Sequence, residues 1–255
     1  MMNMKFSAAG LLLVALAMDS CKSHYQLTGV ERTRIVIDSS YDQNPDEAAA
    51  SFLAPFKRVN DSIMGPVVGR VAHSMNARRP ESDLSNLLAD ILVWAAKDYG
   101  EQPVLGIYNM GGIRADLIKG DVTYGDVLSI APFENKICFV TLTGEQLTEL
   151  FQQIAANGGE GVSHGVELVG TKDRRLLSAR LHGQEIDPQA QYRVATIDYL
   201  QEGNDKMTAF RKGTDVVAPN EASNNTRFLI MNYFKEKQAQ GEEVDARVEG
   251  RIKVQ

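Results

Sequence analysis

Apolar residues recur every three or four positions in several stretches of the chain, and this spacing predicts helices. The strongest pattern runs from Ser82 to Lys97, where one stripe is formed by Leu84, Leu87, Leu88, Ile91, Leu92, Ala95 and Ala96. Ser82 is a natural N-cap, and Gly100 lies just past the end. We expect this helix to belong to the core and to fix the strand that follows it.

Three further helices are predicted from the same kind of pattern. One begins with a capping box, in which Thr143 is the cap and Gln146 lies three residues on, and its buried face is Leu147, Leu150, Phe151 and Ile154. Another spans Asp46–Asp61, and a last one runs from about Ser223 to Gln238. Along the chain, these predicted helices are separated by strand-like segments.

The strand-like segments are short apolar or alternating runs. They are Arg34–Ile37, Pro66–Val71, Val104–Tyr108, Ile137–Leu142, Val166–Val169, Ala179–His182, Tyr192–Ile197 and Arg247–Val254. No repeat or low-complexity linker interrupts the chain after the first 45 residues. We therefore predict one mixed α/β (α+β) domain over residues 46–255, with a mixed sheet and flanking helices.

The first 45 residues have a different character. Lys5 precedes an uncharged apolar run, Ala8–Ala17, which is too short to span a bilayer, and Cys21 follows closely. We predict a signal peptide over residues 1–20, a lipidated Cys21 and a polar tether over 21–45, which would anchor the chain to a bacterial membrane on the periplasmic or cell-surface side. Simple secretion is the alternative, because Asp19 is unusual in a lipoprotein signal.

Composition narrows the possible partners. The net charge is −6 and the pI is about 5.3, so no basic footprint for nucleic acid is present. None of the four histidines has the neighbours of a metal-ligand motif, and we predict no metal site in this chain. The second cysteine, Cys138, lies within an apolar strand and is expected to be a small core residue.

Candidate chemistry first appears in the run Asn109–Arg114, which follows the predicted strand Val104–Tyr108. Gly111 and Gly112 allow positive φ and the close approach of another group. A strand that ends in a glycine turn with Asn and Arg is suited to a polar or anionic ligand. The alternative is an ordinary tight turn with a solvated arginine.

Taken with the rest of the chain, this run resembles the C-terminal domain of the 5'-nucleotidase family. The family's Asn-Gly-Gly-Gly-Ile-Arg is similar to Asn109–Arg114, with Met110 departing at the second position. The resemblance extends from about Phe52 to the C-terminus, and the further matching runs, in family order, are 115–117, 120–124, 132–133, 142–144 and 192–196.

The resemblance implies a fold like that domain and a site that holds the nucleoside part of a substrate. Carried over residue by residue, the site comprises Arg78, Asn109, Gly111, Gly112, Arg114, Phe133, Tyr199 and Asp205. Phe133 and Tyr199 would sandwich the base, and Asp205 would bind the ribose. The position of Arg78 is ambiguous by one residue, because Arg79 is adjacent.

Two of these positions depart from the family pattern. Tyr199 stands where the family usually has Phe, which keeps the stacking face and adds a hydroxyl. Gly203-Asn204-Asp205 replaces Gly-Gly-Asp, so the backbone of that turn is open to change. The alternative interpretations are core aromatics at Phe133 and Tyr199, a surface ion pair at Arg78 and a turn former at Asp205.

In complete family members the catalytic metals are carried by an N-terminal metallophosphatase domain of the same chain. The resemblance therefore implies no catalytic residue and no cofactor in this chain, with two divalent metals only in a partner. One hypothesis is that the chain docks with a separately encoded metallophosphatase, through the helix Asp46–Asp61, and the pair hydrolyses nucleoside monophosphates in nucleotide catabolism. The alternatives are a lipoprotein that only captures nucleosides or nucleotides, and a degenerate structural domain.

Overall fold

The computed structural model describes residues 25–43 and 45–255. The predicted signal peptide and Cys21 lie outside the described residues. By its internal contacts the chain divides into two units, residues 1–52 and Leu53–Gln255. In the first unit, the predicted strand Arg34–Ile37 is wrong: these residues are exposed and unpaired with any strand, and a short 3-10 helix, η1 (Ser39–Gln43), follows them. A strand needs a partner for its backbone groups, and local sequence cannot supply one.

The predicted helix Asp46–Asp61 is confirmed as α2 (Glu47–Met64). No described residue of this helix is buried, although its apolar positions recur at helical spacing. Leu53, Val59 and Ile63 each expose more than half of their surface. These apolar positions of α2 are thus open to solvent in this chain.

The core of the second unit is built around a five-stranded sheet, in which the order is β10-β4-β9-β2-β5. Strand β2 runs parallel to β9, whereas the other pairs are antiparallel, so the predicted mixed sheet is confirmed. Its strands are β2 (Leu105–Tyr108), β4 (Ile137–Thr143), β5 (Gly161–Val162), β9 (Gln191–Ile197) and β10 (Thr214–Val217). All four residues of β2 are buried, as expected for a strand covered on both faces.

Two amphipathic helices pack on this sheet where their capping signals predicted them. α3 (Asp83–Ala95) begins at Ser82, whose side chain completes a capping box with Ser85, and it packs on β2, β5 and β9. α5 (Gly144–Ala156) begins at the predicted Thr143–Gln146 box. It contacts β4 and β9 and also β6 and β7, so it joins the two larger sheets.

Smaller elements complete the unit. The four-stranded sheet has the order β11-β6-β7-β8, and β1 pairs with β3. Their bounds are β1 (Val67–Val71), β3 (Gly120–Thr123), β6 (Val166–Gly170), β7 (Leu176–Leu181), β8 (Gln184–Glu185) and β11 (Ile252–Val254). The predicted C-terminal strand is therefore confined to its last residues, because only these pair with β6.

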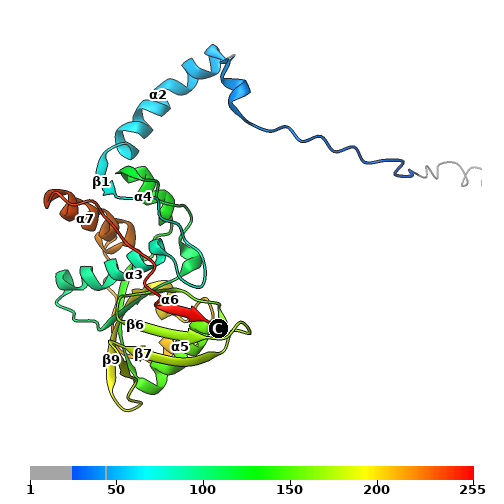
Figure 1. Ribbon diagram of the computed structural model, residues 1–255. Coiled ribbons are helices and arrows are strands. Elements are labelled where there is room, and N and C mark those ends of the chain that lie inside the picture. Colours follow the sequence, from blue (N-terminus) through cyan, green and yellow to red (C-terminus); the bar gives the residue numbers. More distant parts are fainter. Residues whose placement is uncertain (1–24, 44) are drawn as a thin grey trace, which may run out of the picture. The chain divides into compact units, whose positions relative to one another are not determined.

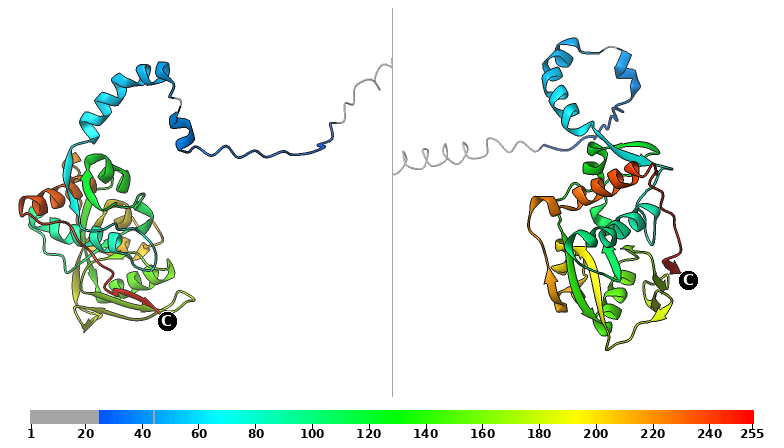
Figure 2. Two further views of the ribbon diagram at one scale, coloured as in Figure 1. Left: turned by 45° about the horizontal axis from the view of Figure 1, so that its top comes forward. Right: turned by 90° about the vertical axis from the view of Figure 1, so that its left-hand side faces the viewer.

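The remaining helices lie at the ends of strands and in loops. They are η2 (Ala96–Tyr99), η3 (Met110–Gly112), α4 (Tyr124–Ile130), α6 (Asp198–Gln201), η4 (Thr208–Lys212), η5 (Ala222–Asn224) and α7 (Thr226–Ala239). α7 packs on α3 and β1, at the end of the unit away from β6 and β7 (Figures 1 and 2). Across the described part of the chain, no helix is long and apolar enough to cross a membrane.

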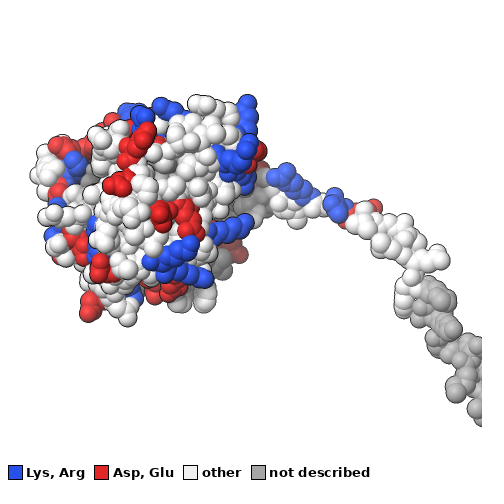
Figure 3. Space-filling model, turned by 90° about the horizontal axis from the view of Figure 1, so that it is seen from below, with Lys and Arg blue, Asp and Glu red and all other residues white. Residues whose placement is uncertain are grey.

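Charged side chains are interspersed on the face of the molecule that Figure 3 presents. Small clusters of acidic and of basic groups both occur on this face. The net charge therefore does not indicate where a ligand site lies, and such a site must be sought in local groups of side chains.

Candidate functional site

A cavity of about 250 Å³ opens where β2, α4 and β9 end. Its walls are Asn109, Gly111, Gly112, Arg114, Phe133, Asn135, Tyr199 and Asp205. Seven of the eight residues predicted as a substrate site thus line one cavity, although they come from segments up to 96 positions apart. The exception is Arg78, which is exposed and absent from this lining.

The carboxylate of Asp205 is held on both of its oxygens. Asn109 Nδ2 donates to Oδ2 over 2.8 Å, and the Tyr199 hydroxyl donates to Oδ1 over 3.0 Å. Asn157 Nδ2 donates to the backbone carbonyl of Asp205 over 2.8 Å. Each carboxylate oxygen retains lone pairs for a further donor, so the group is oriented but still able to accept from a ligand.

This arrangement affects the pKa of Tyr199 and the backbone conformation of Asp205. The hydrogen bond to the Asp205 carboxylate, and then partial desolvation, raise the pKa of Tyr199, so its hydroxyl stays a donor near neutral pH. Asp205 has φ of +51°, in the left-handed region that Asp tolerates better than most residues. The Gly203–Asp205 turn therefore sets the aspartate at the cavity.

The glycine turn differs from expectation in one respect. Gly111 and Gly112 do not adopt positive φ; Met110–Gly112 form the 3-10 turn η3 instead. The expected close approach is present at Gly112, where a Cβ would lie 2.5 Å from Asn109 Oδ1. Glycine is needed at position 112 to admit the Asn109 side chain, whereas a Cβ at Gly111 would lie 3.8 Å from Asp205 Oδ2, an ordinary contact distance.

The two predicted aromatic residues both line the cavity and are partly exposed, Phe133 at 45% and Tyr199 at 37%. In the described part of the chain neither ring contacts another aromatic ring, although the Arg114 guanidinium lies over the Phe133 ring. The Phe133 loop is fastened by Arg227 of α7, whose Nη2 donates to the carbonyls of Pro132 and Phe133, each over 3.0 Å.

Arg114 supplies the positive charge of the cavity. Its guanidinium carbon lies 5.8 Å from the centre of the Phe133 ring, a cation–π distance, and Nη1 donates weakly to Gly111 O over 3.3 Å. No carboxylate pairs with Arg114 among the described residues. The guanidinium is thus free to bind an anionic group of a ligand.

A buried carboxylate, Glu160, lies behind the cavity, and its side chain is wholly inaccessible. Met110 N donates to Oε2 over 2.6 Å, while Arg79 Nη1 and Asn157 Nδ2 donate to Oε1 over 2.8 and 3.3 Å. Burial raises the pKa of Glu160, although the donors from Met110 and Arg79 oppose this. Glu160 links the glycine turn to Asn157, and so to the Asp205 loop.

The family model described as "5'-nucleotidase, C-terminal domain" matches residues 66–212, more than half of the chain. The chain belongs to the 5'-nucleotidase C-terminal domain family. It is 30% identical over 239 residues to the "Trifunctional nucleotide phosphoesterase protein YfkN" of Bacillus subtilis, covering 85% of this chain and 16% of that protein. It is 26% identical over 159 residues to "Protein UshA" of Escherichia coli, covering 61% of this chain and 29% of that protein.

Solved structures support the same fold. A 5'-nucleotidase precursor from Thermus thermophilus superposes with a TM-score of 0.71 and 24% identity, over 82% of this chain and 44% of that one. This 5'-nucleotidase C-terminal domain therefore corresponds to less than half of the chains that it resembles. The predicted family and fold class are confirmed.

Two residues of this 5'-nucleotidase C-terminal domain were missed by sequence reasoning. Asn135 lines the cavity, and its position two residues after Phe133 is the signal that could have found it. Glu160 follows the helix-ending Asn157-Gly158-Gly159, a context typical of an exposed loop, and no local signal marks it as buried. Only the packing of Arg79 and Met110 around it shows its role.

The described residues of the domain contain no group of three or more His, Cys, Asp or Glu side chains that could hold a metal ion.

Proposed function

We propose that this domain binds the nucleoside part of nucleoside monophosphates and acts with a separately encoded metallophosphatase domain that hydrolyses them. The observation that carries the proposal is the shared cavity of Phe133, Tyr199 and Asp205, in which the carboxylate is oriented by Asn109 and Tyr199. Flat faces for a base and a fixed acceptor for ribose hydroxyls are what nucleoside recognition requires.

The binding energy follows from these groups. Stacking on an aromatic face contributes about 1–3 kcal/mol per base and tolerates any base. Asp205 accepts from ribose hydroxyls, because each oxygen keeps a free lone pair beside its protein donor. Arg114 stands at the same cavity with no carboxylate partner in the described chain, and we assign it to the phosphate.

The role of this chain in hydrolysis is to hold and orient the substrate. The metals of the partner domain would supply the activated water and stabilise the developing charge. Membership of a family whose relatives include a named nucleotide phosphoesterase supports this division of labour. The exposed apolar residues Leu53, Val59 and Ile63 of α2 offer a surface on which the partner could dock.

We also propose that the chain is exported and tethered through a lipid on Cys21. Export is supported by the similarity to "Cell wall protein Lmo0130" of Listeria monocytogenes, 27% identical over 67% of this chain and 23% of that protein. Mass spectrometry of the chain purified from membranes would test the anchor. A peptide that begins at unmodified Cys21, or an uncleaved N-terminus, would contradict it.

The binding proposal is tested by calorimetric titration of residues 22–255 with adenosine and with AMP. Saturable binding that weakens at least tenfold in Phe133→Ala is expected, with an unchanged circular dichroism spectrum. If the unaltered chain does not bind either ligand at millimolar concentration, the proposed nucleoside site is contradicted.

The hydrolysis proposal is tested separately by phosphate release from AMP. With Zn²⁺ or Mn²⁺ alone the chain is expected to release none, and release is expected once a metallophosphatase domain from the same genome is added. Turnover by the isolated chain would show that the metal chemistry lies within it. Binding without any effect of the added domain would instead indicate a capture protein.

A further inference from the structure

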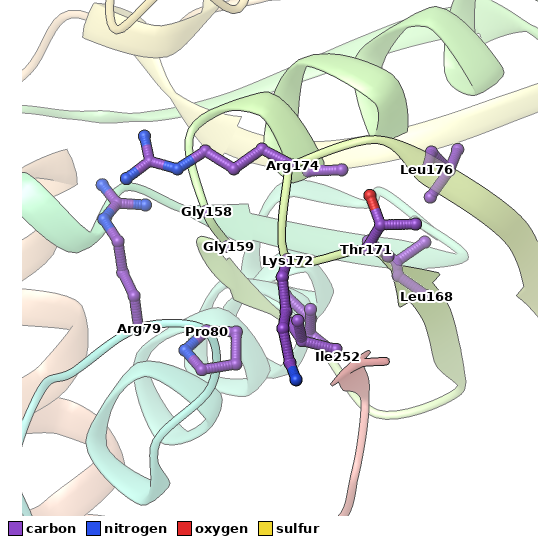
Figure 4. Close-up of a pocket in the computed structure, with 13 residues that line it drawn as sticks. Arg79, Pro80, Gly158, Gly159, Leu168, Thr171, Lys172, Arg174, Leu176 and Ile252 are labelled. Atoms are coloured by element: carbon purple, nitrogen blue, oxygen red, sulfur yellow. The ribbon is translucent and has the colours of Figure 1, made fainter.

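A second cavity, of about 220 Å³, shares no lining residue with the cavity of Phe133 and Tyr199, although its Arg79 and Arg174 also line a third cavity together with Gly111 and Asp205. It is open to solvent on one side and is bounded by the Arg79-Pro80 segment, the end of α5, the turn between β6 and β7, and β11 (Figure 4). Its apolar wall consists of Pro80, Ala155, Leu168, Leu176, Ile252 and Val254.

Backbone constraints keep this cavity in place. Gly159 has φ of +107°, and a Cβ there would lie 2.1 Å from the carbonyl oxygen of Pro80, so only glycine lets the end of α5 close against that segment. On the opposite side, the turn between β6 and β7 is tied by Arg174 N donating to Thr171 O over 2.9 Å. The cavity is thus bounded by fixed turns.

The charged part of the lining has one sign. Arg79, Lys172 and Arg174 line the cavity, and no carboxylate does, in a chain whose net charge is −6. The guanidinium groups of Arg79 and Arg174 point toward each other at one end of the cavity (Figure 4). Both side chains approach Gly158, where a Cβ would lie 3.7 Å from Arg174 Nε and from Arg79 Cδ.

These cations are incompletely neutralised. Arg79 is paired with Glu160, but that carboxylate also serves Met110 and Asn157. Within the described chain, the side chains of Lys172 and Arg174 form no hydrogen bond or ion pair. Arg79 and Arg174 are solvent-exposed, and the planar forks of their guanidinium groups match a carboxylate.

We propose that this second cavity binds a small organic monocarboxylate with an apolar body, of the kind represented by octanoate. The carboxylate is held by Arg79 and Arg174, and the hydrocarbon lies against Leu168, Leu176 and Ile252. The volume is adequate, because an engineered apolar cavity of about 150 Å³ holds a benzene molecule. The binding energy of the tail comes from removing its surface, and that of the wall, from water.

The test is calorimetric titration of octanoate into residues 22–255, which retain every described residue. Saturable one-to-one binding is expected. Acetate, which has the charge without the body, and 1-octanol, which has the body without the charge, are expected to bind at least tenfold more weakly. No saturable binding of octanoate at millimolar concentration, or equal affinity for 1-octanol, would overturn the proposal.

Variants locate the site. Arg174→Gln is expected to weaken octanoate binding at least fivefold. Ala155→Phe, which fills the cavity, is expected to abolish it. The matched control is Arg175→Gln, because Arg175 is the adjacent exposed arginine, pairs with Asp173 and does not line the cavity. Phe133→Ala in the nucleoside cavity is expected to have no effect. Equal losses in Arg174→Gln and Arg175→Gln, or a loss in Phe133→Ala, would contradict the assignment to this cavity.

Discussion

Tyr199 donates its hydroxyl hydrogen to Asp205 Oδ1 over 3.0 Å, so the ring that lines the proposed nucleoside site also orients the carboxylate within it. A phenylalanine could supply the ring without the hydrogen bond. The two functions of Tyr199, an aromatic face and an orienting donor, can therefore be separated by substitution.

Tyr199→Ala is expected to weaken adenosine binding at least tenfold, because a stacking face contributes about 1–3 kcal/mol. Tyr199→Phe retains the ring and is expected to lose only a few-fold in affinity, since a typical hydrogen bond is worth roughly 0.5–1.5 kcal/mol net. Titration calorimetry of both variants measures the difference. Unchanged affinity in Tyr199→Ala would eliminate the stacking role, and an equal loss in both variants would assign binding to the hydroxyl.

Arg114→Ala is expected to weaken the binding of AMP at least fivefold more than the binding of adenosine. The Arg114 guanidinium lines the cavity and has no carboxylate partner in the described chain. Arg78→Ala provides the comparison, since Arg78 is exposed and outside the lining. Competition titrations with the two ligands would show whether Arg114 contacts the phosphate. Equal losses for AMP and adenosine would show that it does not. A larger loss of AMP binding in Arg78→Ala would instead assign the phosphate to Arg78, the other arginine that the family resemblance predicted.

Glu160 is expected to make stability depend on pH. Burial raises its pKa in the folded chain above the ordinary value of 4.5, so folding favours the protonated form. The free energy of unfolding therefore falls as the pH rises from about 4.5 through the raised pKa of the folded state, where the native chain holds more protons than the unfolded chain. Glu160→Gln should remove this contribution to the pH dependence.

The same variant should lose stability at neutral pH. The amide has a single acceptor oxygen, so it cannot accept from both Met110 N and Arg79 Nη1, which bind different oxygens of Glu160. An unsatisfied buried donor costs about 1–3 kcal/mol. Urea unfolding from about pH 4.5 to about pH 7.5 would measure both effects, with the exposed Glu134→Gln as control. An unaltered pH profile in Glu160→Gln would refute the assignment.

Cys138 is expected to be unreactive in the native chain. It is fully buried in β4, as its apolar neighbours predicted, and burial raises the pKa of its thiol to about 12. The thiolate is the reactive form, so a thiol reagent such as DTNB should label residues 22–255 only after denaturation, at one thiol per chain. Rapid stoichiometric labelling of the native chain would show that β4 opens readily.

The contrast between correct and incorrect predictions follows from how local each signal is. Helices α3 and α5 begin at Ser82 and Thr143, where a cap and an apolar stripe occur within a few residues, and both were located from sequence. The residues Arg34–Ile37 have the composition of a strand, but no neighbouring strand pairs with them in the described chain. The glycine turn was located correctly, yet its backbone adopts a 3-10 turn in place of positive φ, and the close approach of Asn109 to Gly112 is visible only in the structure.

The sequence by itself determined the family, the mixed α/β class and the segments that supply Asn109, Arg114, Phe133, Tyr199 and Asp205, because these depend on short ordered motifs. The tertiary structure alone decided that Asp205 is held by Asn109 and Tyr199. It also decided that Glu160 is buried behind the site, and that Arg79 and Arg174 meet at a second cavity. The physical reason is that burial and charge pairing are set by residues far apart along the chain, which only packing brings together.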